Sequence, residues 1–137
     1  GGTEGKTFSA DYQAEGAEDT TIFQMKSGNG GSPNARVSVH GDGTVTLHNG
    51  DGNPKVIAKL EPGQKFNLSV TQTGPGTIDV TVTPEGGEPV TTTGARIDSS
   101  DGPPKDFRFG AYTQNNQASP VTVAVGNIQI DGEPVYA

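Results

Sequence analysis

A two-residue alternation of apolar and polar side chains constrains the fold of this chain more than any other feature. It is cleanest in residues 66–70, 78–82 and 121–125. Because successive side chains of a strand point to opposite faces, the pattern predicts strands with one buried and one solvated face. Shorter segments of similar character are 8–12, 22–26, 35–40, 44–48, 55–59, 107–114 and 127–130. No long apolar stripe has helical spacing, so the sequence predicts an all-β protein.

Glycine and proline divide these segments at short intervals. The chain has 21 Gly and 10 Pro, and many of them lie in turn sequences such as 40–43, 49–54 and 101–104. Such turns are typical of hairpins between antiparallel strands. About ten short strands of this kind fit a two-sheet β-sandwich or jelly roll. With 137 residues, we expect one β-jelly-roll domain over 1–137.

The charge balance limits the class of partner. The net charge is −7, which argues against nucleic acid, because phosphate binding needs a basic face. An acidic ligand is still allowed, since a local cationic groove can exist on an acidic protein. No apolar run approaches the ~18 residues of a membrane span, so we expect no membrane partner. We also expect a monomer.

No cofactor or metal is expected from the motifs. The chain has no cysteine, so disulfides and thiol chemistry are excluded. Asp42, Asp51 and Asp101 lie in glycine-rich turns, but none has the spaced acidic ladder of a calcium loop. They are interpreted as turn residues that tolerate left-handed backbone geometry.

The segment 107–114 has two contrasting faces when it is read as a strand. An apolar face would anchor the strand, while a face with a cation, a phenol and an amide could bind a sugar acid. The first carries Phe107, Phe109 and Ala111, and the second carries Arg108, Gly110, Tyr112 and Gln114.

Two other segments offer a similar polar face. In 22–26, alternation places Gln24 and Lys26 with Ile22, opposite Phe23 and Met25. In the segment 36–40, the polar face consists of Arg36, Ser38 and His40. If the three strands are neighbours in one sheet, their polar faces form an open concave groove with amides, a phenol and several cations.

These residues resemble a known family. The pair of segments 22–26 and 107–114 resembles the β-jelly-roll polysaccharide lyases, namely the alginate and glucuronan lyases with the concanavalin-like fold. That family has a Gln-apolar-His strand and a later strand of roughly Tyr-Phe-Lys-Ala-Gly-x-Tyr-x-Gln. The positions that match this pattern are Gln24, Phe107, Gly110, Tyr112 and Gln114. Arg108 stands where the family has its Lys.

The sequence also departs from the family pattern. Lys26 stands where the family has its catalytic His, and Phe109 replaces a small Ala, which would narrow the groove. The family's Arg-x-Glu-x-Arg motif has no counterpart in this sequence.

The resemblance implies β-elimination on an acidic polysaccharide, a polyuronate such as alginate or glucuronan. Gln24 together with Lys26 or Arg108 would neutralise the substrate carboxylate. Tyr112 would protonate the leaving oxygen, and would also act as the base if nearby cations lowered its pKa. The expected substrate-binding residues are Arg108, Gln114, Arg36 and His40. No cofactor is implied, and the protein would be secreted.

Three hypotheses remain open at this point. The first is a secreted lyase-like enzyme, the second a non-catalytic glycan-binding domain, and the third a structural or surface β-sandwich. Lys26 and the absent Arg-rich motif favour the second over a competent enzyme, whereas the intact run 110–114 favours the first over the third. Taken singly, His40 and His48 are interpreted as residues that flank turns. The lyase-like hypothesis is placed first.

Overall fold

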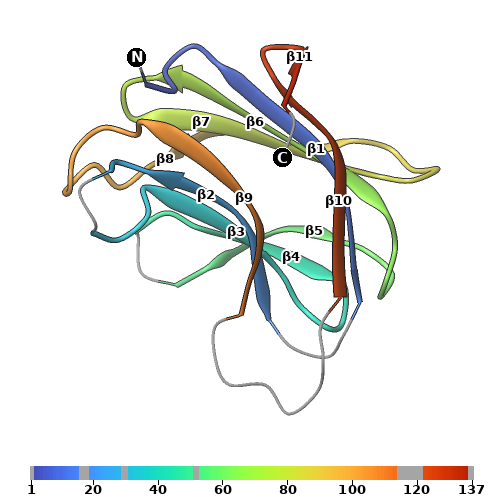
Figure 1. The fold of residues 1–137 in the computed structure, drawn as a ribbon. Helices are drawn as coiled ribbons and strands as arrows, with labels where there is room; N and C mark the ends of the chain where they lie inside the picture. Colours follow the sequence, from blue (N-terminus) through green and yellow to red (C-terminus); the bar gives the residue numbers. More distant parts are fainter. Residues whose placement is uncertain (1, 16–18, 29–30, 51–52, 114–121, 136–137) are drawn as a thin grey trace.

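The structure is a computed structural model that describes residues 2–15, 19–28, 31–50, 53–113 and 122–135. For 110–113 and 122 it describes the backbone alone. The described residues form two antiparallel sheets, one above the other (Figure 1). They contain no helix long and apolar enough to cross a membrane.

The two sheets divide the strands as follows. The six-stranded sheet has the order β11-β10-β1-β6-β7-β8 and the five-stranded sheet the order β5-β4-β3-β2-β9. The strands of the six-stranded sheet are β1 (Thr7–Glu15), β6 (Phe66–Gly74), β7 (Thr77–Pro84), β8 (Val90–Arg96), β10 (Thr122–Ile130) and β11 (Glu133–Pro134). Those of the five-stranded sheet are β2 (Thr20–Lys26), β3 (Ala35–Val39), β4 (Thr44–His48), β5 (Lys55–Lys59) and β9 (Asp106–Thr113). The predicted all-β sandwich of jelly-roll type is confirmed.

An aromatic cluster joins the two sheets. Phe8 of β1 is fully buried, and its ring centroid lies 4.8 Å from that of Phe23 on β2. The rings of Phe107 and Phe109 on β9 each lie 5.9 Å from Phe8. The predicted apolar face of 107–114 therefore does anchor β9 to the core, as far as its side chains are described.

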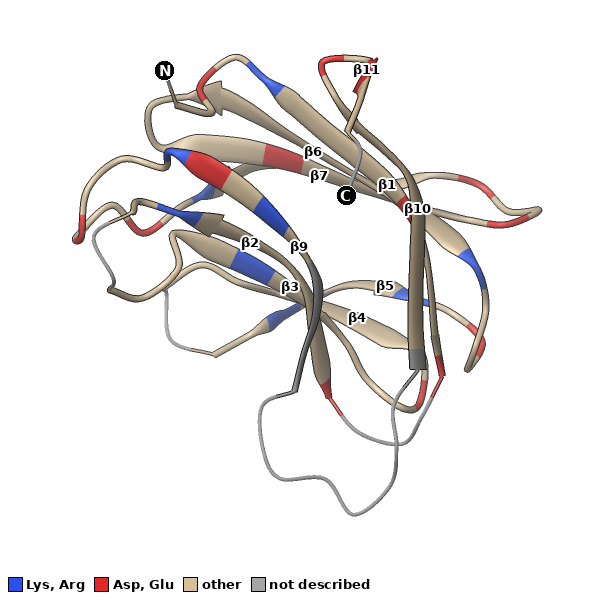
Figure 2. Cartoon of the chain, viewed as in Figure 1, with Lys and Arg blue, Asp and Glu red and all other residues tan. Residues whose placement is uncertain are grey.

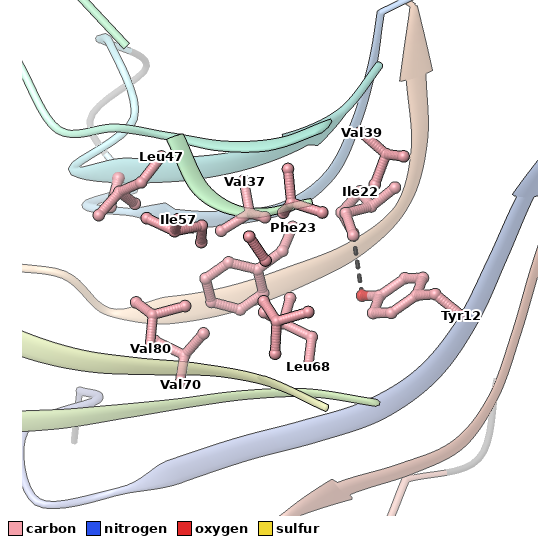
Figure 3. Packing of buried hydrophobic residues seen from close by; sticks show 14 of the residues in the cluster. Tyr12, Ile22, Phe23, Val37, Val39, Leu47, Ile57, Leu68, Val70 and Val80 are labelled. Atoms are coloured by element: carbon pink, nitrogen blue, oxygen red, sulfur yellow. Dashed lines mark hydrogen bonds between the residues drawn. The ribbon is translucent and has the colours of Figure 1, made fainter. Parts of the chain in front are cut away.

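A buried hydrogen bond also crosses the core. The Tyr12 hydroxyl on β1 donates to the Ile22 carbonyl oxygen on β2 at 2.9 Å (Figure 3). The Tyr12 ring stacks on Phe66, with centroids 5.7 Å apart. The phenol thus has a polar partner in an otherwise apolar interior, as buried hydroxyl groups require.

One predicted face of β2 is wrong. Ile22 does not share the polar face with Gln24, because it is fully buried in the core beside Phe23. The register shifts at this point, so that Phe23 pairs with Val37 while Thr21 pairs with Ser38. Such a β-bulge breaks the alternation, and Thr21 takes the polar-face position that strict alternation assigned to Ile22.

Candidate functional site

The three polar faces inferred from the sequence lie in one sheet. β9, β2, β3 and β4 are successive neighbours, and one side chain from each outer face falls in register with the next. Across the four strands the aligned residues are Arg108, Gln24, Arg36 and His48. We call this set the polar row. With strands about 4.8 Å apart, it extends over about 14 Å.

The polar row is accessible to a ligand. Gln24, Arg36 and His48 are half-buried, and the Arg108 side chain is 47% exposed. Their immediate neighbours along β3 and β9 point into the core, which fixes the row on the outer face. Figure 2 shows Lys and Arg on the adjacent strands β9, β2 and β3. A local cationic surface therefore exists on a chain with net charge −7.

A second row beside the first consists of buried hydroxyl groups. Thr21, Ser38 and Thr46 pair in register across β2, β3 and β4, and they are 0%, 2% and 5% exposed. The hydroxyls of Thr21 and Ser38 lie 3.2 Å apart, within hydrogen-bond distance. With so little exposed surface, these side chains support the sheet and leave ligand contact to the polar row.

Two predicted site residues are described only in part or not at all. The backbone register of β9 places Tyr112 opposite Thr21, next to the polar row. The side chain of Tyr112 and the whole of Gln114 lie outside the described residues.

Lys26 and Arg108 have neighbours of their own. The Lys26 Nζ donates to the Gly31 carbonyl oxygen at 2.6 Å, at the end of β2 beyond Gln24. The Arg108 guanidinium lies 3.9 Å from the Asp106 carboxylate, a long contact between exposed groups that contributes little energy. Arg108 thus keeps its charge directed to solvent on the outer face, whereas Lys26 is partly engaged with the chain.

His40 lies beyond the end of β3, and a tight turn positions it. Its backbone N–H donates to the Thr44 carbonyl, and the Asp42 carboxylate accepts a hydrogen bond from the Thr44 N–H at 2.9 Å. The hydrogen bonds from Thr44 lower the pKa of the exposed Asp42 to about 2. Both ring nitrogens of His40 are engaged, with Nδ1 2.5 Å from the Asp19 carboxylate and Nε2 2.7 Å from the Thr46 hydroxyl.

His48 is the residue that sequence reasoning missed. Burial lowers its pKa, and the positive charge of Arg36 and then of His40 adds to this, while Asp19 opposes it. Its Nδ1 is buried without a hydrogen-bond partner among the described residues. A neutral imidazole therefore lies beside a guanidinium. The alternation of residues 44–48 indicates that His48 lies on the outer face of the strand, but only the strand pairing reveals that Arg36 is its neighbour.

The lowered pKa of His48 predicts a pH-dependent stability. The unfolded chain takes up a proton at His48 near pH ~6.5, whereas the folded chain resists protonation until lower pH. Stability is therefore lost as the pH falls below that value. We expect His48→Gln to reduce this loss, measured as the free energy of unfolding of both proteins in urea between neutral and mildly acidic pH. Parallel pH profiles for the two proteins would contradict the prediction.

Neither a metal site nor a related sequence indicates a function for the described part of the chain. Within the described ranges, no three His, Cys, Asp or Glu side chains gather in a way that could hold a metal ion. The chain matches no protein-family model and no curated protein.

Comparison with solved structures identifies proteins of the same fold. A Trypanosoma rangeli sialidase solved with 2,3-difluorosialic acid superposes with a TM-score of 0.67 at 13% identity, over 98% of this chain. The polysaccharide lyase family 18 protein aly-SJ02 superposes with a TM-score of 0.59 at 19% identity. The alginate lyase from Alteromonas sp. 272 gives 0.57 at 17% identity. Both lyase matches cover 91% of this chain.

The matches differ in how much of each neighbour they include. This chain spans 21% of the length of the sialidase and 70% of each lyase. At these identities the likeness concerns the fold. The chain has the antiparallel two-sheet β-sandwich that the jelly-roll polysaccharide lyases share.

Proposed function

We propose that this protein is a polysaccharide lyase-like carbohydrate-active domain that binds an acidic polysaccharide, a polyuronate such as alginate or glucuronan. The polymer would lie across the outer face of the five-stranded sheet. The observation that carries the proposal is the polar row, in which two guanidinium groups flank an amide.

The chemistry of the polar row suits a chain of uronates. A guanidinium binds a carboxylate through two parallel hydrogen bonds, so Arg36 and Arg108 would each take a carboxylate. Gln24 lies between them and would bind hydroxyl groups or a carboxylate with its amide. The ring nitrogens of His40 are already bonded to Asp19 and Thr46, so His40 would hold these two side chains in place beside the row. Lys26 would add positive charge at the end of the row.

The structural neighbours support this class of ligand. Two of them are named as polysaccharide and alginate lyases, and the sialidase was also solved with sialic acid. Alginate and sialic acid both carry carboxylates. An extracellular polymer as ligand would also require the protein to be secreted, which we include in the proposal.

Binding in solution tests the proposal. Titration of the protein with polymannuronate, polyguluronate and glucuronan oligosaccharides by calorimetry should detect binding to at least one of them. Its affinity should fall as salt is added, because exposed charges are screened. No binding to any of the three, or an affinity that is the same at low and high salt, would refute the proposed function.

A second candidate function is cleavage by β-elimination, which the register of β9 favours because it places Tyr112 opposite Thr21, next to the polar row. Arg36 and Gln24 would stabilise the charge that develops on the substrate carboxylate. Tyr112 would take the proton from the carbon beside the carboxylate. The electron pair would form the new double bond as the bond to the 4-linked oxygen breaks. Tyr112 would then protonate that oxygen with the proton it took.

The elimination chemistry predicts a measurable product and a selective loss. With a polyuronate that binds, the wild type should release chains with unsaturated ends, detected by their ultraviolet absorbance. Tyr112→Phe should abolish this absorbance while polyuronate binding is retained, because only the group that transfers the proton is removed. Binding by the wild type without any such product would instead identify a non-catalytic glycan-binding domain.

A further inference from the structure

A groove of about 700 Å³ lies on the other sheet, away from the polar row. It crosses β10, β1 and β6 and is bounded by the turn after β7. Its floor is a third in-register set of residues, one from each of four adjacent strands. These are Gly126, Asp11, Asn67 and Thr83.

Two amides hold the carboxylate of this set in a defined orientation. Asn67 Nδ2 donates to one Asp11 oxygen at 2.9 Å, and Asn127 Nδ2 lies 3.4 Å from the other. Asn127 has a left-handed backbone, φ 50°, where the register of β10 shifts against β1. A carboxylate can accept about four hydrogen bonds. Asp11 is exposed and therefore retains capacity to accept hydrogen bonds from a ligand.

The groove is open next to this carboxylate. A Cβ atom added at Gly126 would meet no heavy atom within 4 Å, and the backbone there is outside the left-handed region. β11 pairs with β10 only at Gln129 and Ile130, so among the described residues β10 forms the edge of the sheet beside Gly126. A ring-sized ligand could therefore lie over Gly126 and reach Asp11.

The charges and apolar atoms of the lining indicate the class of ligand. The charged side chains of the lining are Asp11, Glu85 and Lys65, a net negative set that disfavours a polyuronate. Pro84 and Ala124 supply apolar surface in the same groove. An uncharged sugar presents hydroxyl donors to a carboxylate and C–H faces to apolar groups. We propose that this groove is a second glycan site, which binds a neutral hexose polysaccharide.

Affinity gel electrophoresis tests this site independently of the polar row. Native gels would contain a β-glucan, a mannan or a galactan. At least one of them should retard the wild-type protein. Asp11→Asn, which preserves side-chain shape, should weaken the interaction roughly tenfold, because it removes the charged acceptor. Gly126→Val should have a similar effect, because its side chain fills the open space.

Two control variants separate this site from general effects. Gly76→Val introduces the same side chain at a glycine that also has open space around it, outside the groove, and should be retarded like the wild type. Arg36→Ala should also leave the retardation unchanged, since it alters only the polar row. No retardation in any neutral polysaccharide would overturn the proposal. So would retardation that persists in both Asp11→Asn and Gly126→Val.

Discussion

Phe8→Ala is expected to lower the free energy of unfolding by about 3–5 kcal/mol, the range for removing a large aromatic side chain from a core. Phe8 of β1 is fully buried, and its ring contacts Phe23 on β2 and two phenylalanines on β9 of the other sheet. Its removal would leave a cavity between the sheets. The anchor of β9 would also be weakened, because Phe107 and Phe109 would lose a ring neighbour.

Urea denaturation of the wild type and the variant measures this effect. Val56→Ala provides the control, because Val56 is 67% exposed on β5 and its truncation should change stability by no more than about 0.5 kcal/mol. A loss for Phe8→Ala as small as that of the control would show that the two sheets do not meet at this aromatic cluster.

Arg36→Ala should weaken polyuronate binding about 10- to 100-fold. Arg36 occupies the interior of the polar row, in register with Gln24 on one side and His48 on the other. Hydrogen bonds to charged groups contribute about 1.5–3 kcal/mol each, which corresponds to this range of affinity. Because Arg36 lies inside the polar row, its loss would also interrupt the binding surface. Contacts of the polyuronate with Gln24 and His48 would therefore not replace the lost hydrogen bonds.

A second arginine provides a matched control for charge. Arg96 is exposed on β8, in the other sheet, and Arg96→Ala changes the net charge by the same amount. Calorimetric titration with the same polyuronate should show wild-type affinity for Arg96→Ala. Equal weakening by both substitutions would mean that the interaction follows overall charge rather than the polar row.

Local alternation was sufficient to predict most strands and their faces. In β6 and β7, burial alternates residue by residue, as the apolar and polar side chains do. The two faces of β9 are also as expected where side chains are described, with Phe107 and Phe109 toward the core and Arg108 exposed. The position of a strand and the direction of its side chains depend on residues that are close together in the sequence, so both can be read from the local pattern.

Features that depend on partners distant in sequence could not be predicted in this way. β8 was missed because it is an edge strand with little burial, and its threonines need no apolar alternation. The segments 121–125 and 127–130 were expected as separate strands, yet residues 122–130 form one strand, β10, with an irregularity at Asn127. The bulge at Ile22 and the pairing of His48 with Arg36 likewise follow from strand register, which a single sequence does not encode locally.

NMR mapping of a bound polyuronate would locate its binding surface on the protein. The ¹⁵N-labelled protein would be titrated with the oligosaccharide that binds most tightly, and shifts of backbone and side-chain N–H signals would be recorded. We predict the largest changes at Gln24, Arg36 and His48, with the side-chain amide of Asn67 on the opposite sheet unchanged. Changes confined to the Asn67 side of the molecule, with none along the polar row, would show that the polyuronate does not bind the five-stranded sheet.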